Sequence, residues 1–164
     1  MLEEKYLELA EKQFCQYKNL GEKAMIQLDP VQLFHVNNEN SNSIAVIVKH
    51  LHGNMLSRWT NFLTADGEKP GRDRNGEFEN DIKDETNLQL LWDEGWRCLF
   101  SALSTLKPGN LGEIIYIRQE PHTVLEAINR QIAHYSYHIG QIVFAAKALK
   151  DAGWQNLSIP KKIK

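Results

Sequence analysis

A regular series of apolar residues near the end of the chain constrains the fold more than any other sequence feature. Its members follow one another at alternating steps of three and four residues: Leu125, Ile128, Ile132, Tyr135, Ile139, Ile142, Ala146 and Leu149. That period places the whole series on one face of an α-helix. A helix with a single apolar face needs other elements to cover it. We therefore expect a helical protein in which Gly153 is the C-terminal cap of this last helix.

Three further stretches repeat the pattern and predict three more helices. Their apolar faces extend from Leu2 to Ala24, from Ile44 to Phe62 and from Leu88 to Leu106. Residues that start or stop helices flank these stretches: Asp29-Pro30, the polar run 40–43, Thr86 or Asn87, and Pro108-Gly109. Four amphipathic helices bury their apolar faces only against one another. We expect an all-α four-helix bundle that forms one domain over residues 1–164.

Two connections between the predicted helices carry further signals. The shorter one precedes the last helix and alternates Ile115 and Ile117 with Tyr116 and Arg118, which favours a short two-stranded ribbon. The longer one, residues 64–85, is polar and dense in both kinds of charge. A connection of that length is typical of a lid, a binding loop or disordered chain, and a solvated crossover between helices is an equal alternative.

The composition argues against several classes of function. The chain has 19 Lys and Arg against 21 Asp and Glu, so it lacks the basic excess that carries non-specific nucleic-acid binding. Charged residues interrupt the apolar positions of residues 1–12, and no stretch reaches the length of a membrane span. Cys15 and Cys98 are far apart without a CxxC spacing, which favours buried free thiols in a reducing compartment. We expect a cytoplasmic protein without a nucleic-acid or membrane partner.

The candidate chemistry is concentrated in the histidines. His134 and His138 are one turn apart on the last predicted helix, where both imidazoles can reach one metal ion. They lie on one side of the apolar face together with Gln131 and Gln141, in a polar line without Lys or Glu. Such a line is typical of the wall of a polar cavity. The spacing by itself is also common among ordinary surface and core histidines.

A metal site needs a further ligand, and the second predicted helix offers two candidates. His50 and His52 lie on opposite flanks of Leu51, and periodicity does not choose between them. His35 and His122 fall at connections, where a loop or helix-start role is the simpler interpretation. Three neutral imidazoles from two helices would leave the other coordination positions of an ion open, as catalytic sites do.

The order and spacing of several short segments identify a family resemblance. Two of them contain His50 and the pair His134 and His138: Val48-Lys49-His50-Leu51 and His134-Tyr135-Ser136-Tyr137-His138-Ile139-Gly140-Gln141. With these, the chain resembles the DinB/YfiT-like superfamily of metalloenzymes. Further segments resemble a bacterial domain-of-unknown-function subfamily within it: Lys49-His50-Leu51 with Gly53-Asn54-Met55, Asp66-Gly67-Glu68-Lys69-Pro70, and Glu120-Pro121-His122-Thr123. The resemblance spans essentially the whole chain.

This resemblance implies a DinB-like four-helix bundle, usually homodimeric, in which three histidines hold nickel or zinc. Carried over to this chain, the implied ligands are His50, His134 and His138, which favours His50 over His52. Relatives with known chemistry include transferases and isomerases that use the low-molecular-weight thiols bacillithiol or mycothiol. The function implied is a metal-dependent S-transferase or hydrolase that acts on a small molecule. The alternative is a non-catalytic, stress-related binding or scaffold bundle that holds metal incidentally.

Three residues near the predicted ligands are candidates for substrate contacts. Arg58 and Arg130 could hold an anionic substrate near the mouth of the site, although a solvated arginine is the simpler interpretation. Asn54 follows His50 by one helical turn and is a candidate for contact with a ligand or substrate. No glutamate accompanies the histidine pair in the HExxH manner, which weakens simple hydrolysis relative to thiol transfer.

The third predicted helix is unusually aromatic. Trp92, Trp96 and Phe100 together offer more large aromatic surface than one packing face readily uses. We interpret the tryptophans as core or dimer-face residues, and we expect part of this surface to contribute to the homodimer that the resemblance implies.

Overall fold

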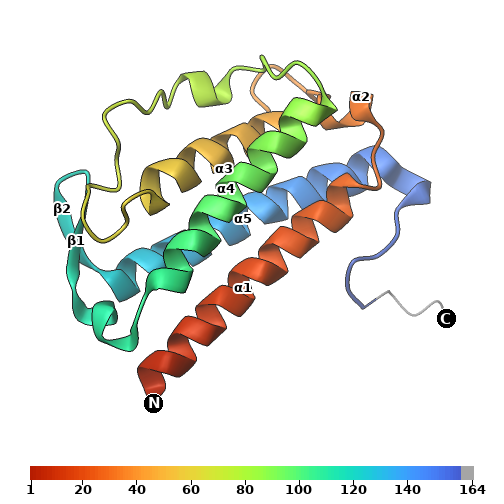
Figure 1. Cartoon of the computed structure of the whole chain (residues 1–164). Coiled ribbons are helices and arrows are strands. Elements are labelled where there is room, and N and C mark those ends of the chain that lie inside the picture. The colour runs from red at the N-terminus through yellow and green to blue at the C-terminus, as the bar shows by residue number, and fades with distance from the viewer. Residues whose placement is uncertain (160–164) are drawn as a thin grey trace.

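The computed structural model describes residues 1–159, and the described chain is mostly helical. Figure 1 shows four long helices side by side: α1 (Leu2–Met25), α3 (Ile44–Trp59), α4 (Glu85–Thr105) and α5 (Val124–Lys150). Short helical turns lie in the connections and after α5: α2 (Pro30–Leu33), η1 (Gly76–Phe78), η2 (Pro108–Gly112) and η3 (Asp151–Gly153). The predicted ribbon is confirmed, because β1 (Ile114–Ile117) pairs with β2 (Glu120–Thr123) in an antiparallel sheet.

Hydrogen-bonding side chains begin the two helices that carry the histidines. The Ser43 hydroxyl oxygen accepts the Val46 N–H at 3.1 Å at the start of α3, as the polar run predicted. Thr123 and Glu126 form a reciprocal pair at the start of α5. The Thr123 hydroxyl oxygen accepts the Glu126 N–H at 3.1 Å, and the Glu126 carboxylate accepts the Thr123 N–H at 2.7 Å. These caps fix where the two helices begin.

The predicted start of α4 and the predicted end of α5 are wrong. The N-terminal cap of α4 is Asp84 rather than Thr86 or Asn87, because the Asp84 carboxylate accepts the Asn87 N–H at 2.8 Å. Thr86 and Asn87 therefore lie within the first turn of the helix. The last helix ends before Gly153, at an Asp151 cap whose φ is 50°. Gly153 instead lies in the short turn η3.

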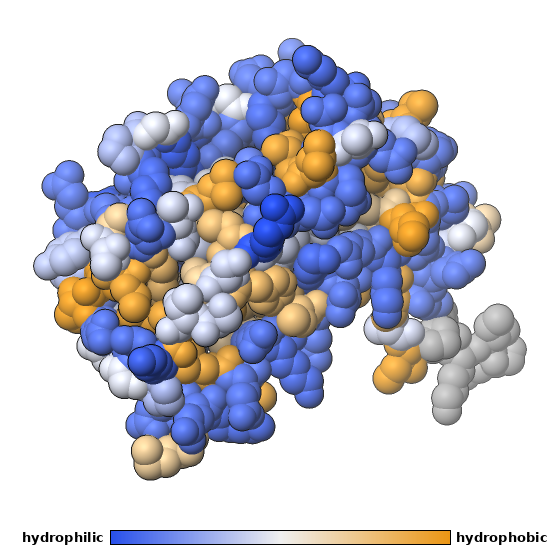
Figure 2. Space-filling view, viewed as in Figure 1, coloured by the Kyte–Doolittle hydropathy of each residue, from blue (hydrophilic) through white to orange (hydrophobic). Residues whose placement is uncertain are grey.

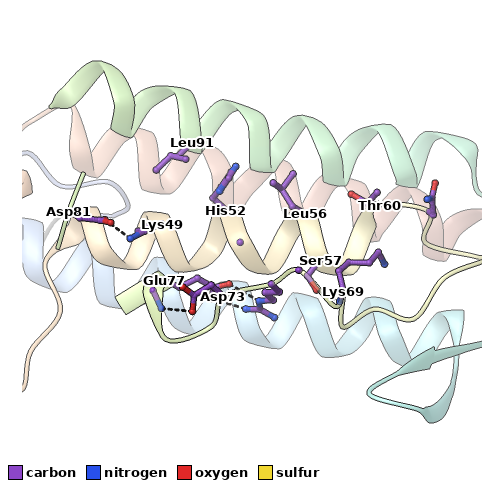
Figure 3. Close-up of a pocket in the computed structure, with 15 residues that line it drawn as sticks. Lys49, His52, Leu56, Ser57, Thr60, Lys69, Asp73, Glu77, Asp81 and Leu91 are labelled. Carbon is purple, nitrogen blue, oxygen red and sulfur yellow. Dashed lines mark hydrogen bonds and ion pairs between the residues drawn. The ribbon is translucent and has the colours of Figure 1, made fainter. Parts of the chain in front are cut away.

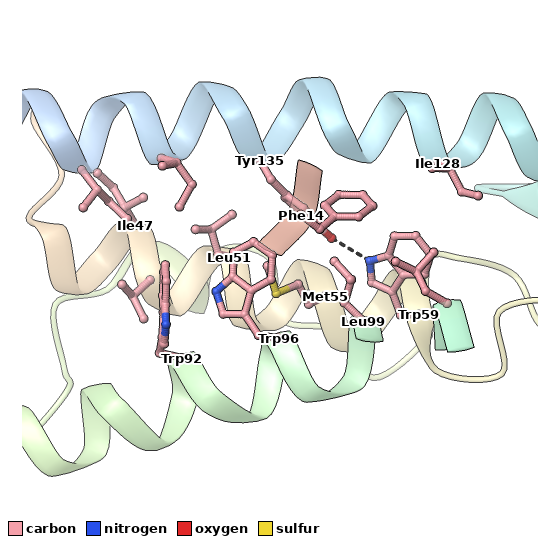
Figure 4. Close-up of a cluster of buried hydrophobic side chains, with 14 of the residues drawn as sticks. Phe14, Ile47, Leu51, Met55, Trp59, Trp92, Trp96, Leu99, Ile128 and Tyr135 are labelled. Atoms are coloured by element: carbon pink, nitrogen blue, oxygen red, sulfur yellow. Dashed lines mark hydrogen bonds between the residues drawn. The ribbon is translucent and has the colours of Figure 1, made fainter. Parts of the chain in front are cut away.

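One apolar core lies between the four long helices. α3 packs along α4, and α1 packs along α5. Figure 4 labels ten of the buried side chains: Phe14, Ile47, Leu51, Met55, Trp59, Trp92, Trp96, Leu99, Ile128 and Tyr135. Close approach requires a missing side chain at Gly21, where a Cβ would lie 2.6 Å from the Trp92 ring. Packing of the core therefore depends on its large side chains and on Gly21, which leaves room for the Trp92 ring.

The aromatic residues of α4 do not form the exposed surface that the sequence suggested. Trp92 and Trp96 are 2% and 1% exposed within the single chain, and Phe100 is half-buried. Their role as dimer-forming residues is therefore wrong for the two tryptophans, whose surface the core already covers. Figure 2 shows a mainly hydrophilic face with several hydrophobic areas. Among the described residues, no helix has the length and apolar character needed to cross a membrane.

The α3–α4 connection (residues 60–84) is fastened to the strand pair. α3 ends at Trp59, and the positive φ of Asn61, 50°, turns the chain away, so Phe62 lies beyond the helix on which it was predicted. The Asp66 carboxylate then accepts the N–H groups of Arg118 and Gln119, at 2.8 and 2.7 Å, in the turn between β1 and β2. Figure 1 shows the connection passing the strands and returning beside α3.

Candidate metal centre

The structure brings together the three histidines that the resemblance indicated. His50 extends from the middle of α3, and His134 and His138 extend from consecutive turns of α5. The Nε2 atom of His134 lies 3.4 Å from that of His50 and 3.1 Å from that of His138. One ring nitrogen from each residue lies within 4.8 Å of the others. We call these three residues the histidine cluster, which could bind a metal ion.

The structure also separates the two candidates on α3. His52 Nε2 lies 2.8 Å from a carboxylate oxygen of Glu94 on α4. Because two residues rotate about 200° around a helix, His50 and His52 point toward different neighbours. Only His50 joins the histidine cluster.

The second ring nitrogen of two histidines has a hydrogen-bond acceptor. His50 Nδ1 donates to Glu77 Oε2 at 2.8 Å, and His138 Nδ1 lies 2.8 Å from Gln141 Oε1. With the ring proton on Nδ1, the Nε2 lone pair of each of these rings is directed into the cluster. His134 Nδ1 is buried without a hydrogen-bond partner in the described residues.

Glu77 lies outside the histidine cluster and contacts it through His50. Its Oε1 accepts Arg72 Nε at 2.6 Å and its Oε2 accepts Arg72 Nη2 at 2.8 Å, in addition to the His50 contact. Burial raises the pKa of Glu77, but the hydrogen bonds from Arg72 and His50 outweigh burial and hold the pKa below its usual value. A Cβ on Gly53 would lie 2.3 Å from Glu77 Oε1. The absence of a side chain at Gly53 therefore lets the Glu77 carboxylate lie close to α3.

Burial keeps the α5 imidazoles neutral. Burial lowers the pKa of His134 to about 3, with a further lowering from its basic neighbours. The pKa of His138 falls to about 4, again mainly through burial, and the Gln141 contact opposes that fall. Neutral imidazole is the form that binds a metal ion.

The geometry of the histidine cluster fits a divalent ion. Nitrogens that bind one tetrahedral ion at about 2.0 to 2.1 Å lie roughly 3.3 Å from one another. The two Nε2 separations at His134, 3.4 and 3.1 Å, are close to that value. The carboxylate on His50 Nδ1 is also the usual partner of a metal-binding histidine, because it fixes the orientation of the ring. The donor set therefore suits a transition metal.

Two cavities have Arg72 in their lining. The smaller, about 340 Å³, is lined by His50 and His134 and thus opens onto the histidine cluster. The larger, about 720 Å³, contains none of the three histidines. Figure 3 shows this larger cavity, with His52 and Leu91 on the α4 side of α3 and Glu77 on the other side. The smaller cavity is therefore the candidate site.

Asn54 lines the smaller cavity, as its position after His50 suggested. It is 5% exposed, and its Oδ1 accepts the Tyr135 hydroxyl at 3.0 Å. The Tyr135 oxygen in turn accepts the Trp59 indole N–H at 3.0 Å. Burial raises the pKa of Tyr135 well above its usual value, so this hydroxyl stays protonated and holds Asn54 in place.

Four other predicted residues lie away from the cluster. His35 follows α2 at the surface, as expected of a loop residue. His122 is not at a helix start but in β2, opposite Ile115. Cys15 is exposed rather than buried and Cys98 is half-buried; both are free thiols. The Cys15 expectation was wrong because its helix position faces away from the core.

The sequence interpretation missed Glu77 and Arg72 as parts of the site. Both lie in the α3–α4 connection, whose charge density suggested either a binding loop or a solvated crossover. A buried ion pair within that charged stretch has no periodicity that would distinguish it from exposed charges.

Comparisons with known proteins identify a family without a described activity. The family model "Protein of unknown function (DUF1572)" matches residues 2–163, so the chain belongs to that family. Neither a curated protein nor a solved structure matches the chain.

Proposed function

We propose that this member of the DUF1572 family is a metal-dependent enzyme whose His50, His134 and His138 hold one divalent transition ion. The observation that carries the proposal is the convergence of three Nε2 atoms at 3.4 and 3.1 Å, with a carboxylate on the far side of the His50 ring. Converging nitrogen lone pairs repel one another, and a cation between them removes that repulsion. Imidazole ligands suit zinc or nickel, which are the ions proposed.

The proposed site is catalytic rather than structural. Structural zinc sites are usually closed by four protein ligands, whereas catalytic sites keep a position for water or substrate. Only three ligand residues meet here among the described residues, and the cavity at His50 and His134 gives a small molecule access to them. A divalent ion in such a site supplies Lewis acidity and lowers the pKa of a water or thiol ligand.

The lining of the cavity favours thiol transfer over hydrolysis. No carboxylate of the described chain lines the smaller cavity. Glu77 is adjacent to the cluster, but Arg72 and His50 already engage both of its oxygens. A general base for water is therefore missing from the described lining, while a thiol substrate brings its own nucleophile. A low-molecular-weight thiol is the proposed co-substrate.

The wider architecture is proposed from the same features. The four long helices, with one residue of the histidine cluster on α3 and two on α5, support a DinB-like four-helix bundle that forms one domain over residues 1–164. We also propose a homodimer in the cytoplasm. Tyr137 and Phe144 are 59% and 79% exposed and lie two turns apart on α5, which makes that helix face a better candidate contact than α4.

Metal content of tag-free protein tests the central proposal. Plasma mass spectrometry is expected to find about one zinc or nickel ion per chain in the parent protein and little in His50→Ala, His134→Ala or His138→Ala. His52→Ala is the matched control, because His52 comes from the same helix but contacts Glu94 instead. Equal metal content in all five proteins would refute the site.

Cobalt substitution tests the chemistry. Millimolar thiol at pH 8 is expected to change the visible spectrum of the cobalt-loaded protein, because the spectrum reports the ligands of the ion. A spectrum that thiol leaves unchanged would count against thiol transfer and favour hydrolysis or a non-catalytic protein.

A further inference from the structure

Arginines gather around the cavity of the histidine cluster. The chain has six arginines, and five of them line this one cavity of about 340 Å³: Arg58, Arg72, Arg74, Arg118 and Arg130. They come from α3, from the α3–α4 connection, from the turn between the strands and from α5. Four separate parts of the fold therefore deliver guanidinium groups to one place, although the whole chain has a net charge of −2.

Two carboxylates neutralise part of this charge. Glu68 lies 3.1 Å from Arg58 Nη2, 3.1 Å from Arg118 Nε and 3.4 Å from Arg72 Nη1. Glu77 holds Arg72 through two further hydrogen bonds. Five guanidinium groups against two carboxylates leave three positive charges unbalanced. Within residues 1–159, neither Arg74 nor Arg130 has a carboxylate within 4.0 Å.

Three residues that line this cavity each have a buried polar atom without a hydrogen-bond partner in the described chain. Arg58 is 4% exposed, and its Nε is buried without a hydrogen-bond acceptor in the described chain. Gln131 is 3% exposed, and its Oε1 is buried without a donor. His134 Nδ1 is the third such atom. Buried polar groups are rarely left unpaired, so three on residues lining one cavity indicate a polar occupant.

We propose that this cavity binds a small oxyanion with at least two negative charges and a hydroxyl group, as substrate or as the anionic part of one. The unbalanced guanidiniums supply donors and charge for the oxyanion. Gln131 Oε1 accepts only, so it requires a donor such as a hydroxyl. The inference rests on the proposed function in one respect, because the same cavity gives access to the proposed metal ligands.

Three probes separate the possible sources of that chemistry: inorganic phosphate, tartrate and succinate. Tartrate and succinate share a dicarboxylate skeleton, and only tartrate has hydroxyl groups. Isothermal titration calorimetry at low ionic strength is expected to show binding of phosphate, tartrate or both, with succinate weaker than tartrate. Phosphate binding alone identifies a phosphate-bearing substrate, and tartrate binding alone identifies a hydroxy acid. Absence of binding by all three would overturn the inference.

The variants use exposed arginines without carboxylate partners. Arg74→Gln and Arg130→Gln are each expected to weaken binding about tenfold, the loss of one charge-assisted hydrogen bond. Arg97→Gln is the matched control, because Arg97 is the one arginine outside the cavity and is exposed on α4. Equal affinity in Arg97→Gln and both cavity variants would overturn the inference. Gln131→Met removes the acceptor while keeping the chain length and is expected to abolish the preference for tartrate.

The titrations are run on metal-loaded and on chelator-treated protein. Metal binding without arginine-dependent anion binding would refute this inference and leave the metal centre standing. Arginine-dependent anion binding in His134→Ala that has lost its metal would support the inference independently of the metal centre.

Discussion

Glu77 Oε2 lies 2.8 Å from His50 Nδ1, and this contact makes the α3–α4 connection part of the histidine cluster. The same carboxylate forms a two-pronged ion pair with Arg72, and both side chains are buried. Breaking a buried ion pair on one side costs about 3 to 5 kcal/mol, because the remaining charge is left uncompensated. The orientation of a proposed metal ligand is thus determined by a segment that is neither α3 nor α5.

Glu77→Gln is expected to lower metal affinity about 10- to 100-fold, the usual effect of removing the carboxylate behind a metal-binding histidine. The amide preserves the shape of the side chain but removes the charge that supports the His50 ring. Competition with a chromophoric chelator measures the affinity. Glu79→Gln serves as the control, because Glu79 is exposed in the same connection. An affinity loss of equal size in both variants would contradict a specific role for Glu77.

Gly53→Ala is expected to weaken metal binding without touching a ligand. The new Cβ would lie 2.3 Å from Glu77 Oε1, so the carboxylate must move away from His50. The same substitution at Gly140 meets no atom within 4 Å and is expected to stabilise α5 by about 0.5 to 1 kcal/mol. Chelator competition and urea unfolding of both variants provide the comparison. Unchanged metal affinity in Gly53→Ala would show that Glu77 is dispensable.

The sequence predicted the helices and the histidine pair because both depend on local spacing. Apolar steps of three and four residues appear directly as helix faces, and a pair four residues apart must share one face. The choice of His50 over His52 came from the family resemblance instead. Both lie on the same helix and differ only in the helix that each one faces. His50 contacts a residue of α5, and His52 contacts a residue of α4.

The connection could not be predicted because its structure depends on distant contacts. The Asp66 carboxylate holds the connection in place only by accepting hydrogen bonds from the turn at Arg118 and Gln119, more than fifty residues later. Arg72 and Glu77 are likewise two charges among many until α3 covers them. Trp92 shows the same limitation in the core, because its burial depends on Gly21 in another helix.

The metal-free protein is expected to lose stability as pH falls below about 6.5, the unperturbed pKa of histidine. Burial lowers the folded-state pKa of His134 to about 3 and that of His138 to about 4. Between these values and 6.5 the unfolded chain binds more protons than the folded chain. The free energy of unfolding is therefore greatest above 6.5 and falls as pH falls toward the folded-state values, by about 1.4 kcal/mol per pH unit for each imidazole that stays neutral.

Urea unfolding of chelator-treated protein between pH 7.5 and 4.5 measures this dependence. The double variant His134→Gln/His138→Gln lacks both groups and is expected to show a much flatter profile over the same range. If the parent and the double variant have the same profile, other groups cause the acid sensitivity. Added zinc or nickel at 100 times its dissociation constant is expected to stabilise the parent at neutral pH by about 2.7 kcal/mol.

Tyr135→Phe is expected to destabilise the protein by about 1 to 3 kcal/mol, because the lost hydroxyl serves two buried partners. Its oxygen accepts the Trp59 indole N–H, and its hydrogen is donated to Asn54 Oδ1, each at 3.0 Å. Tyr137→Phe on the same helix is the control, since Tyr137 is 59% exposed and its variant is expected to change stability by less than about 0.5 kcal/mol. Urea unfolding at neutral pH compares the two.

Tyr135→Phe is also expected to weaken anion binding in the cavity, because Tyr135 holds Asn54 in the cavity lining. Without the Tyr135 donor, the buried amide of Asn54 loses the contact that fixes its orientation at the cavity wall. Anion affinity in the arginine-lined cavity should therefore fall in Tyr135→Phe, while metal content stays at the parent value, because Tyr135 does not belong to the histidine cluster. Equal stability of Tyr135→Phe and Tyr137→Phe, with unchanged anion affinity, would show that the hydroxyl neither supports the core nor positions Asn54.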